Sequence, residues 1–251
     1  MSAIDTSAAR PAPPQGPPPR TVYLVGGLIF VALVVVAAVA AVAWPLLQGQ
    51  RAQTAYSVTG PVAGRDAATL DLLSGVTSVS VEGADLGGTL YRVESPQSPT
   101  VTDRDGRVQV QVTGGDGVVA IQLNRGVRWT VRFTGGAQSN TADLREVGKL
   151  AGVEYVGGVS AIELTLPGAS GTVPVKVDGG VGTLRVHAPE AAPVRVNASG
   201  GAGGVTIDGV AHNGVGAGSV YPSKGWDTAK DRYDIDATNG ISSVVVDRTA
   251  P

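Results

Sequence analysis

The sequence contains no cysteine among its 251 residues. This absence excludes disulfide bonds, cysteine-ligated zinc, iron–sulfur clusters and thiol catalysis, and it leaves the redox compartment open. Histidine is almost as rare, because the chain has only His187 and His212, and neither has a carboxylate or a second histidine at ligand spacing. We therefore expect no metal site and no cofactor. We interpret His187 as a solvated side chain, because it lies on the outward phase of its segment.

Aromatic residues and positive charge are also scarce. Only 4% of the residues are aromatic against 43% hydrophobic, so the core must consist of Val, Ile, Leu and Ala. Beyond Arg51 the chain has 16 basic and 20 acidic residues, a net charge of −4. This balance leaves no basic face large enough for nucleic acid, so we expect no nucleic-acid partner.

One long apolar run is present, and it divides the chain. Residues 22–44 contain no charge, and no charged residue occurs between Arg20 and Arg51. A bilayer core takes about 20 helical residues to cross, so we predict a transmembrane helix over residues 21–47, with residues 22–44 in contact with lipid. Residues 1–20 are rich in proline and poor in apolar side chains, which predicts a disordered tail. Residues 48–55 form the expected linker, and residues 56–251 the expected folded domain.

The flanking charges orient this helix. Arg10, Arg20 and the amino terminus lie on one side and Arg51 on the other, which favours a cytoplasmic tail and an extracytoplasmic domain in the cell membrane. A cleaved signal peptide is the alternative, because residues 41–43 (Ala-Val-Ala) have the form that signal peptidase accepts. We favour the uncleaved anchor, because the apolar run is longer than the hydrophobic region of a typical signal peptide, which has about 7–15 residues.

Beyond residue 54 the pattern becomes that of β-strands. Short runs alternate apolar and polar side chains, and Gly-Gly, Asp-Gly and Pro-Gly pairs separate them, as at Asp105-Gly106 and Gly179-Gly180. Residues 140–150 are the one place where a helix is an alternative to a strand. Alternation with Val131 and Phe133 places Trp129 in the core.

The centres of these runs follow one another at nearly constant spacing. The centres of the first series are Val79, Leu90, Val101, Val110, Ile121 and Val131, which lie 11, 11, 9, 11 and 10 residues apart. The centres of the second series are Leu164, Val175, Val186, Val196 and Ile207, which lie 11, 11, 10 and 11 residues apart. Such regularity predicts a solenoid with two short strands per turn, in which each turn buries the apolar face of the next. An antiparallel sandwich spaces its turns similarly and is the alternative.

The spacing fails between Ile207 and Ile235, in a long glycine-rich segment. Long segments of this kind are usually functional or mobile. Tyr221, Lys224 and Trp226 in this segment are our candidate partner-binding residues. The alternative is that the aromatic side chains close the end of the solenoid against water.

Several segments together resemble a known family: residues 166–168, 175–180, 184–189, 193–196, 203–209, 232–236 and 240–247. Their Gly and Val patterns resemble the extracytoplasmic toastrack, or putative-adhesin, domains of bacteria, which also occur in LiaF-like membrane proteins. The resemblance implies an all-β, β-helix-like fold on a membrane tether, with roles in surface assembly or envelope stress. It supplies no catalytic motif.

The sequence predicts a non-enzymatic interaction or scaffold module of the cell envelope, which contacts an envelope protein or a glycan. The alternative from another class is a polysaccharide-active enzyme, with a polar strip made of Glu163, Lys176, Arg185 and Arg195. A third hypothesis is a purely structural spacer. The run of Asp231, Asp234 and Asp236 lacks the glutamate that closes a calcium loop, so we interpret it as a solvated strand face.

Overall fold

The computed structural model describes residues 55–113 and 117–249. Within these ranges all regular structure is β, and no helix occurs that could cross a membrane. The predicted tail, transmembrane helix and nearly all of the linker lie outside the described residues. The described residues belong to one compact unit, and the description below concerns this unit alone.

The described residues form nineteen strands. They are β1 (Tyr56–Pro61), β2 (Ala67–Leu72), β3 (Val76–Ala84), β4 (Thr89–Ser95), β5 (Pro99–Arg104), β6 (Arg107–Val112), β7 (Val118–Asn124), β8 (Arg128–Phe133), β9 (Ala137–Asp143), β10 (Lys149–Tyr155), β11 (Val159–Thr165), β12 (Thr172–Val177), β13 (Val181–Pro189), β14 (Val194–Ala198), β15 (Ala202–Ile207), β16 (Val210–Val215), β17 (Ser219–Pro222), β18 (Arg232–Ala237) and β19 (Ile241–Thr249). Strands β9 and β10 occupy most of residues 140–150, so the helical alternative there is wrong.

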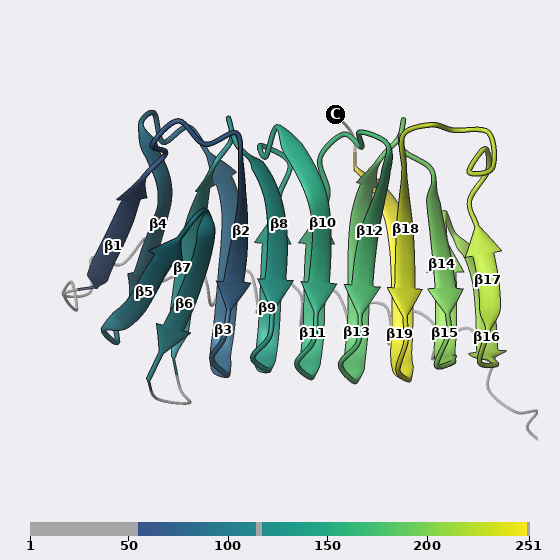
Figure 1. Cartoon of the computed structure of the whole chain (residues 1–251). Helices are drawn as coiled ribbons and strands as arrows, with labels where there is room; N and C mark the ends of the chain where they lie inside the picture. Colours follow the sequence, from purple (N-terminus) through teal and green to yellow (C-terminus); the bar gives the residue numbers. More distant parts are fainter. Residues whose placement is uncertain (1–54, 114–116, 250–251) are drawn as a thin grey trace, which may run out of the picture. The chain divides into compact units, whose positions relative to one another are not determined.

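The strands make two sheets that face each other (Figure 1). Sheet A has ten strands in the order β1-β4-β7-β3-β9-β11-β13-β19-β15-β16. Sheet B has nine, in the order β17-β14-β18-β12-β10-β8-β2-β6-β5. A rung of the structure is one strand of sheet B followed directly by one strand of sheet A.

The centre of the domain is a parallel coil with two strands per turn. From β8 to β13 the chain alternates between the sheets, and each strand pairs in parallel with the strand two places later. Partners lie 22 residues apart, as in Val131↔Val153 and Ile162↔Leu184. The predicted solenoid is therefore present here, and the antiparallel sandwich is not.

The order of the rungs differs from the expected one at both ends. The rung β2–β3 lies between β6–β7 and β8–β9, and the rung β18–β19 lies between β12–β13 and β14–β15. The expectation that each turn is covered by the next turn along the chain is wrong there. The cause is that hairpins and parallel rungs have the same residue spacing: Leu90 and Val101 lie in strands that pair antiparallel with their neighbours.

Antiparallel strands cap both ends of the coil. Strands β4 and β5 pair with β7 and β6, and strands β16 and β17 pair with β15 and β14. Two of these hairpins turn at Asp105-Gly106 and Asp208-Gly209, where both residues have positive φ (52° and 81°, 51° and 81°). These values are those of a two-residue type I′ turn, which Asp-Gly favours.

The core lies between the two sheets and follows the alternation of the sequence. Trp129 is completely buried, as predicted, and its indole N–H donates to the carbonyl of Asn124 at 2.9 Å. Phe133 and Tyr155 stack with ring centroids 4.8 Å apart. Most other core residues are Val, Leu and Ile. Few aromatic side chains are needed to fill the core, because each rung buries the apolar face of its neighbour.

One corner of the coil requires glycine, because successive turns touch there. A Cβ on Gly157 would lie 2.5 Å from the carbonyl oxygen of Gly135, and one on Gly179 would lie 2.2 Å from that of Gly157. Such distances are well inside van der Waals contact. The stacked glycines thus let the backbone of neighbouring rungs approach closely.

Candidate interaction site at the Trp226 loop

The segment that breaks the spacing contains the strands β16 and β17 and, between β17 and β18, a loop of residues 223–231. Ser223 fixes its start: its backbone N–H donates to the carbonyl of Val194 at 2.8 Å, and its Oγ accepts the Val194 N–H at 2.9 Å. A further backbone bond joins Ala229 N to Gly225 O at 3.1 Å. The loop is therefore attached to β14, which is far from it in the sequence.

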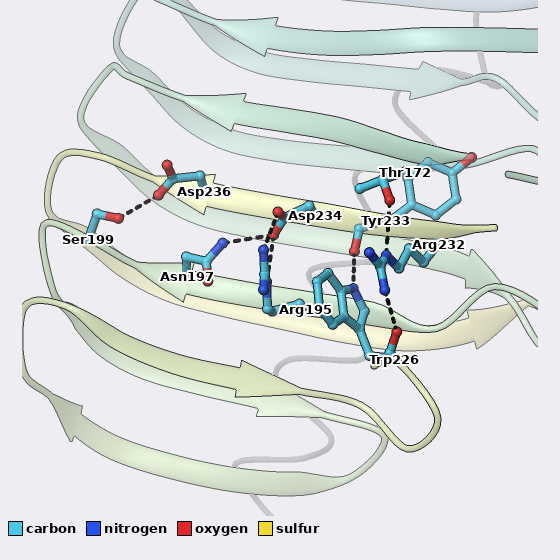
Figure 2. A network of polar contacts seen from close by, with 9 residues as sticks. All are labelled: Thr172, Arg195, Asn197, Ser199, Trp226, Arg232, Tyr233, Asp234 and Asp236. Atoms are coloured by element: carbon cyan, nitrogen blue, oxygen red, sulfur yellow. Dashed lines mark hydrogen bonds and ion pairs between the residues drawn. The ribbon is translucent and has the colours of Figure 1, made fainter. Parts of the chain in front are cut away.

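Trp226 holds the middle of this loop. Its ring lies between two guanidinium groups, with Arg195 at 3.7 Å and Arg232 at 4.0 Å from the ring centroid. Its indole N–H donates to the carbonyl of Tyr233 at 3.0 Å (Figure 2). Only 7% of the residue is exposed. Trp226 therefore anchors the loop from within through cation–π contacts and a hydrogen bond.

The first of these guanidinium groups is itself held by an ion pair. Arg195 binds both carboxylate oxygens of Asp234, at 3.0 and 2.5 Å, and Asn197 donates to the same carboxylate at 2.7 Å (Figure 2). The hydrogen bond with Asp234 is the main reason why the pKa of the Arg195 guanidinium lies above its usual value. The pair fixes the position of Arg195 over the ring.

Arg232 ties the loop to a third strand. Its Nε donates to the hydroxyl of Thr172 on β12, and another of its nitrogens donates to the carbonyl of Trp226, both at 2.9 Å. The adjacent Tyr233 is buried, and its hydroxyl donates to the carbonyl of Pro167 at 2.8 Å. Burial raises the pKa of the Tyr233 phenol above its usual value. The loop thus rests on a connected network across β12, β14 and β18.

The outer side of the loop is exposed and carries charge of both signs. Lys224, Asp227, Thr228 and Lys230 are all exposed. These residues form what we call the loop rim. The network beneath supports the backbone of the loop that carries the rim.

The three predicted binding residues therefore have different surroundings. Lys224 lies on the loop rim and Trp226 lies beneath it. Tyr221 lies on β17, packs against the core and stacks on His212 with centroids 4.3 Å apart. Tyr221 thus packs at the end of the core. Binding by these residues stays a prediction.

The sequence reasoning did not connect the residues that build the network. Arg195, Arg232 and Asp234 occupy outward positions of β14 and β18, and these strands are separated by three others in the chain. Their alternation with apolar residues was a usable signal for an outward face. The contacts between these residues could not be predicted from the sequence, because they depend on β18 lying beside β14. Asp234 and Asp236 accept hydrogen bonds from side chains on β14 and just beyond it.

His187 is another difference from the sequence reasoning. Its side chain is 19% exposed, its Nδ1 lies 2.5 Å from Asp247, and its Nε2 lies 3.4 Å from Glu163. The expectation of a solvated side chain is wrong. The reason is that β19, which supplies Asp247, returns to lie beside β13.

The polar strip proposed for a polysaccharide-active enzyme is divided. Glu163 and Arg185 are register partners in sheet A, whereas Lys176 and Arg195 belong to sheet B. Among the described residues no group of three or more His, Cys, Asp or Glu side chains is arranged to hold a metal ion.

A groove of about 720 Å³ lies at the carboxyl ends of β3, β9, β11 and β13. Its lining includes Glu82, Asp143, Glu146 and Glu190, with Arg145 as the only basic side chain. Arg145 binds Asp143 at 2.6 Å, and this hydrogen bond holds the pKa of the Asp143 carboxyl below its usual value. The groove therefore has an acidic rim, which the sequence alone did not reveal.

Comparison with known proteins identifies the fold. No family model and no curated protein gives a significant match to the sequence. The crystal structure of a putative cell adhesion protein from Clostridium sporogenes superposes with a TM-score of 0.56 over 78% of this chain and 100% of that protein, at 17% identity. The two chains share a fold. A putative adhesin from Bacteroides fragilis aligns over 76% of this chain and 97% of its own length at 10% identity, but its TM-score of 0.26 is too low to indicate a shared fold.

This likeness confirms the coarser part of the sequence resemblance. The described residues are all β, and their fold is that of a protein named for cell adhesion. The LiaF-like relationship and the transmembrane anchor stay predictions.

Proposed function

We propose that this chain is a single-pass membrane protein whose β-solenoid domain lies outside the cytoplasm and serves as a non-enzymatic, adhesin-like interaction or scaffold module of the bacterial cell envelope. The uncharged run of residues 22–44 and the basic residues before it support the anchor and its orientation. The fold shared with a putative cell adhesion protein supports the adhesin-like role. A role in envelope stress belongs to the same class of function.

The observation that carries this proposal is the anchored loop on a rigid coil. The network of Trp226, Arg195 and Arg232 fixes the loop, while Lys224 and Lys230 remain exposed. Binding costs less when the contact residues are already ordered, so such a rim suits recognition of an envelope protein or glycan. The expected contacts are charged hydrogen bonds from the two lysines.

Crosslinking in whole cells followed by recovery of the full chain tests the proposal. We expect that the double variant Lys224→Glu/Lys230→Glu loses a partner that the unaltered chain recovers. The control is Lys149→Glu, an exposed residue on β10 of the same sheet, which should keep the partner. Equal recovery by all three chains would overturn the loop as the contact. Recovery of no partner by any chain would favour a structural spacer.

The location is tested separately. Protease added to intact spheroplasts should digest the domain and leave the amino-terminal tail protected, and the chain should sediment with membranes. A domain that resists protease until the membrane is opened would contradict the proposed orientation.

One observation favours the enzymatic alternative. Glu163 and Asp247 flank His187 on the outer face of sheet A, so a histidine lies there between two carboxylates that are themselves exposed. If this cluster hydrolyses a glycan, Glu163→Gln should abolish turnover while the fold is kept. Absence of turnover by the unaltered chain on envelope polysaccharides would exclude it.

A further inference from the structure

The two ends of the coil are built differently. At the end formed by β16 and β17, both sheets stop one strand beyond the same rung, β14–β15. At the other end, sheet A continues for two strands beyond β7, whereas sheet B continues for one beyond β6. The β16–β17 end is therefore flush, and the opposite end is stepped, as Figure 1 shows.

The stepped end carries features that block further strand pairing. Strand β5 begins at Pro99 and carries Asp103 and Arg104, and β1 ends at Pro61 after an irregularity in its register. Charges, proline and irregular register are common devices by which proteins protect sheet edges.

The two edge strands of the flush end carry no charged side chain. Strand β16 has the sequence VAHNGV, with neither proline nor a carboxylate, lysine or arginine, and β17 has Pro222 only at its last position. The acid just before β16, Asp208, is already paired with Arg248 at 2.7 Å. In an edge strand every second residue directs its N–H and C=O away from the sheet, so β16 offers unused backbone hydrogen-bonding groups.

Apolar side chains are exposed at this same end. Val210 on β16 is 60% exposed and Val220 on β17 is 51% exposed, the two highest values among the exposed valines and leucines of the described residues. Between the sheets, the stacked rings of His212 and Tyr221 close the core. The two edge strands at this end therefore carry exposed apolar side chains and no charged ones, and each leaves one edge of its sheet open.

We propose that the β16–β17 end binds the same end of a second copy of this chain. A two-fold axis perpendicular to the sheets places β16 antiparallel to its copy and β17 antiparallel to its copy at the same time. Both sheets then continue from one subunit into the other.

A second copy is the occupant that fits best, because the surface offers two edges at the separation of two packed sheets. A single extended peptide pairs with one edge only, and the stepped end presents its two edges at different levels. The residues outside the description join the domain at β1, between β6 and β7, and at β19, and none of these strands is an edge strand at this end.

The test is the mass of the purified full chain in detergent, measured by sedimentation. We expect a dimer for the unaltered chain and a monomer for Val210→Lys/Val220→Lys, because a charged side chain on each edge strand disfavours edge-to-edge pairing. Val118→Lys is the matched control, since Val118 is a similarly exposed valine (49%) on β7 and should remain dimeric. A monomeric unaltered chain, open-ended oligomers, or a dimeric double variant would each overturn the proposal.

A second measurement does not depend on those lysines being tolerated. The chain has no cysteine, so Asn213→Cys introduces a unique thiol on β16. A short bis-maleimide should link this variant into covalent dimers, because Asn213 lies near the proposed axis. Thr183→Cys, in the middle of sheet A, should not be linked. Equal linking of both variants would contradict the end-to-end dimer.

Discussion

At the scale of single residues, the same residue type has two different roles in this chain. Trp129 fills the centre of the core, whereas Trp226 lies at its margin between two guanidinium groups. The first position could be predicted from alternation with Val131 and Phe133. The second could not, because Arg195 and Arg232 reach the ring only through the rung order.

We expect Trp226→Ala to lower the free energy of unfolding by about 3 kcal/mol, as is usual for removal of a buried ring. It also leaves the cation–π contacts of Arg195 and Arg232 unmade. Denaturant unfolding of the full chain measures the change. Lys224→Ala, two residues away and exposed, should change the stability little. A similar loss for both variants would show that the ring is not the anchor.

The ion pair of Asp143 and Arg145 predicts a pH effect. Hydrogen bonding to Arg145 lowers the pKa of the Asp143 carboxyl below 3.8, so the pair stabilises the fold above that pH and the contribution is lost as the pH falls through the lowered pKa. An NMR titration of the carboxyl should give a midpoint below 3.8. In Arg145→Gln the midpoint should rise towards the usual value. An unchanged midpoint in that variant would contradict the assignment.

At the scale of elements, the sequence predicted most strands and their faces. Residues such as Val79, Val110, Val131, Leu164 and Val175 were placed correctly on the inner face, because alternation depends only on local geometry. The neighbour with which each strand pairs, and whether the pairing is parallel or antiparallel, were harder to predict from the sequence. A hairpin and a rung need similar numbers of residues, so Leu90 and Val101 looked like members of the parallel series.

The corner where Gly135, Gly157 and Gly179 of successive rungs touch allows a test of the contact between rungs, because two adjacent glycines there have different surroundings. A Cβ on Gly179 would lie 2.2 Å from the Gly157 carbonyl, whereas a Cβ on Gly180 would meet nothing within 4 Å. We expect Gly179→Ala to cost at least about 2 kcal/mol of stability, in the range of overpacked sites. Gly180→Ala should cost little. Thermal unfolding of the two variants measures the difference, and equal stability would show that the rungs are not in contact there.

At the scale of the whole molecule, the order of the rungs in space differs from their order in the chain at both ends of the coil. The last rung, β18–β19, lies inside the coil and connects β12–β13 with β14–β15. Contacts in a simple solenoid join only consecutive repeats, whereas here the carboxyl-terminal rung contacts rungs that precede it by different distances in the chain. The Trp226 loop exists because the chain must travel from the cap at β17 back to this internal position.

The rung order can be tested directly, because the chain has no cysteine of its own. Arg185 on β13 is the register partner of Val245 on β19, and Thr206 on β15 is the partner of Val245 on its other side. Neighbouring strands lie about 4.8 Å apart, which permits a disulfide, whereas strands two places apart lie about 10 Å apart, which does not. Under mild oxidation the Arg185→Cys/Val245→Cys pair should therefore form a disulfide, and the Arg185→Cys/Thr206→Cys pair should not. A disulfide in the second pair and none in the first would contradict the returning rung.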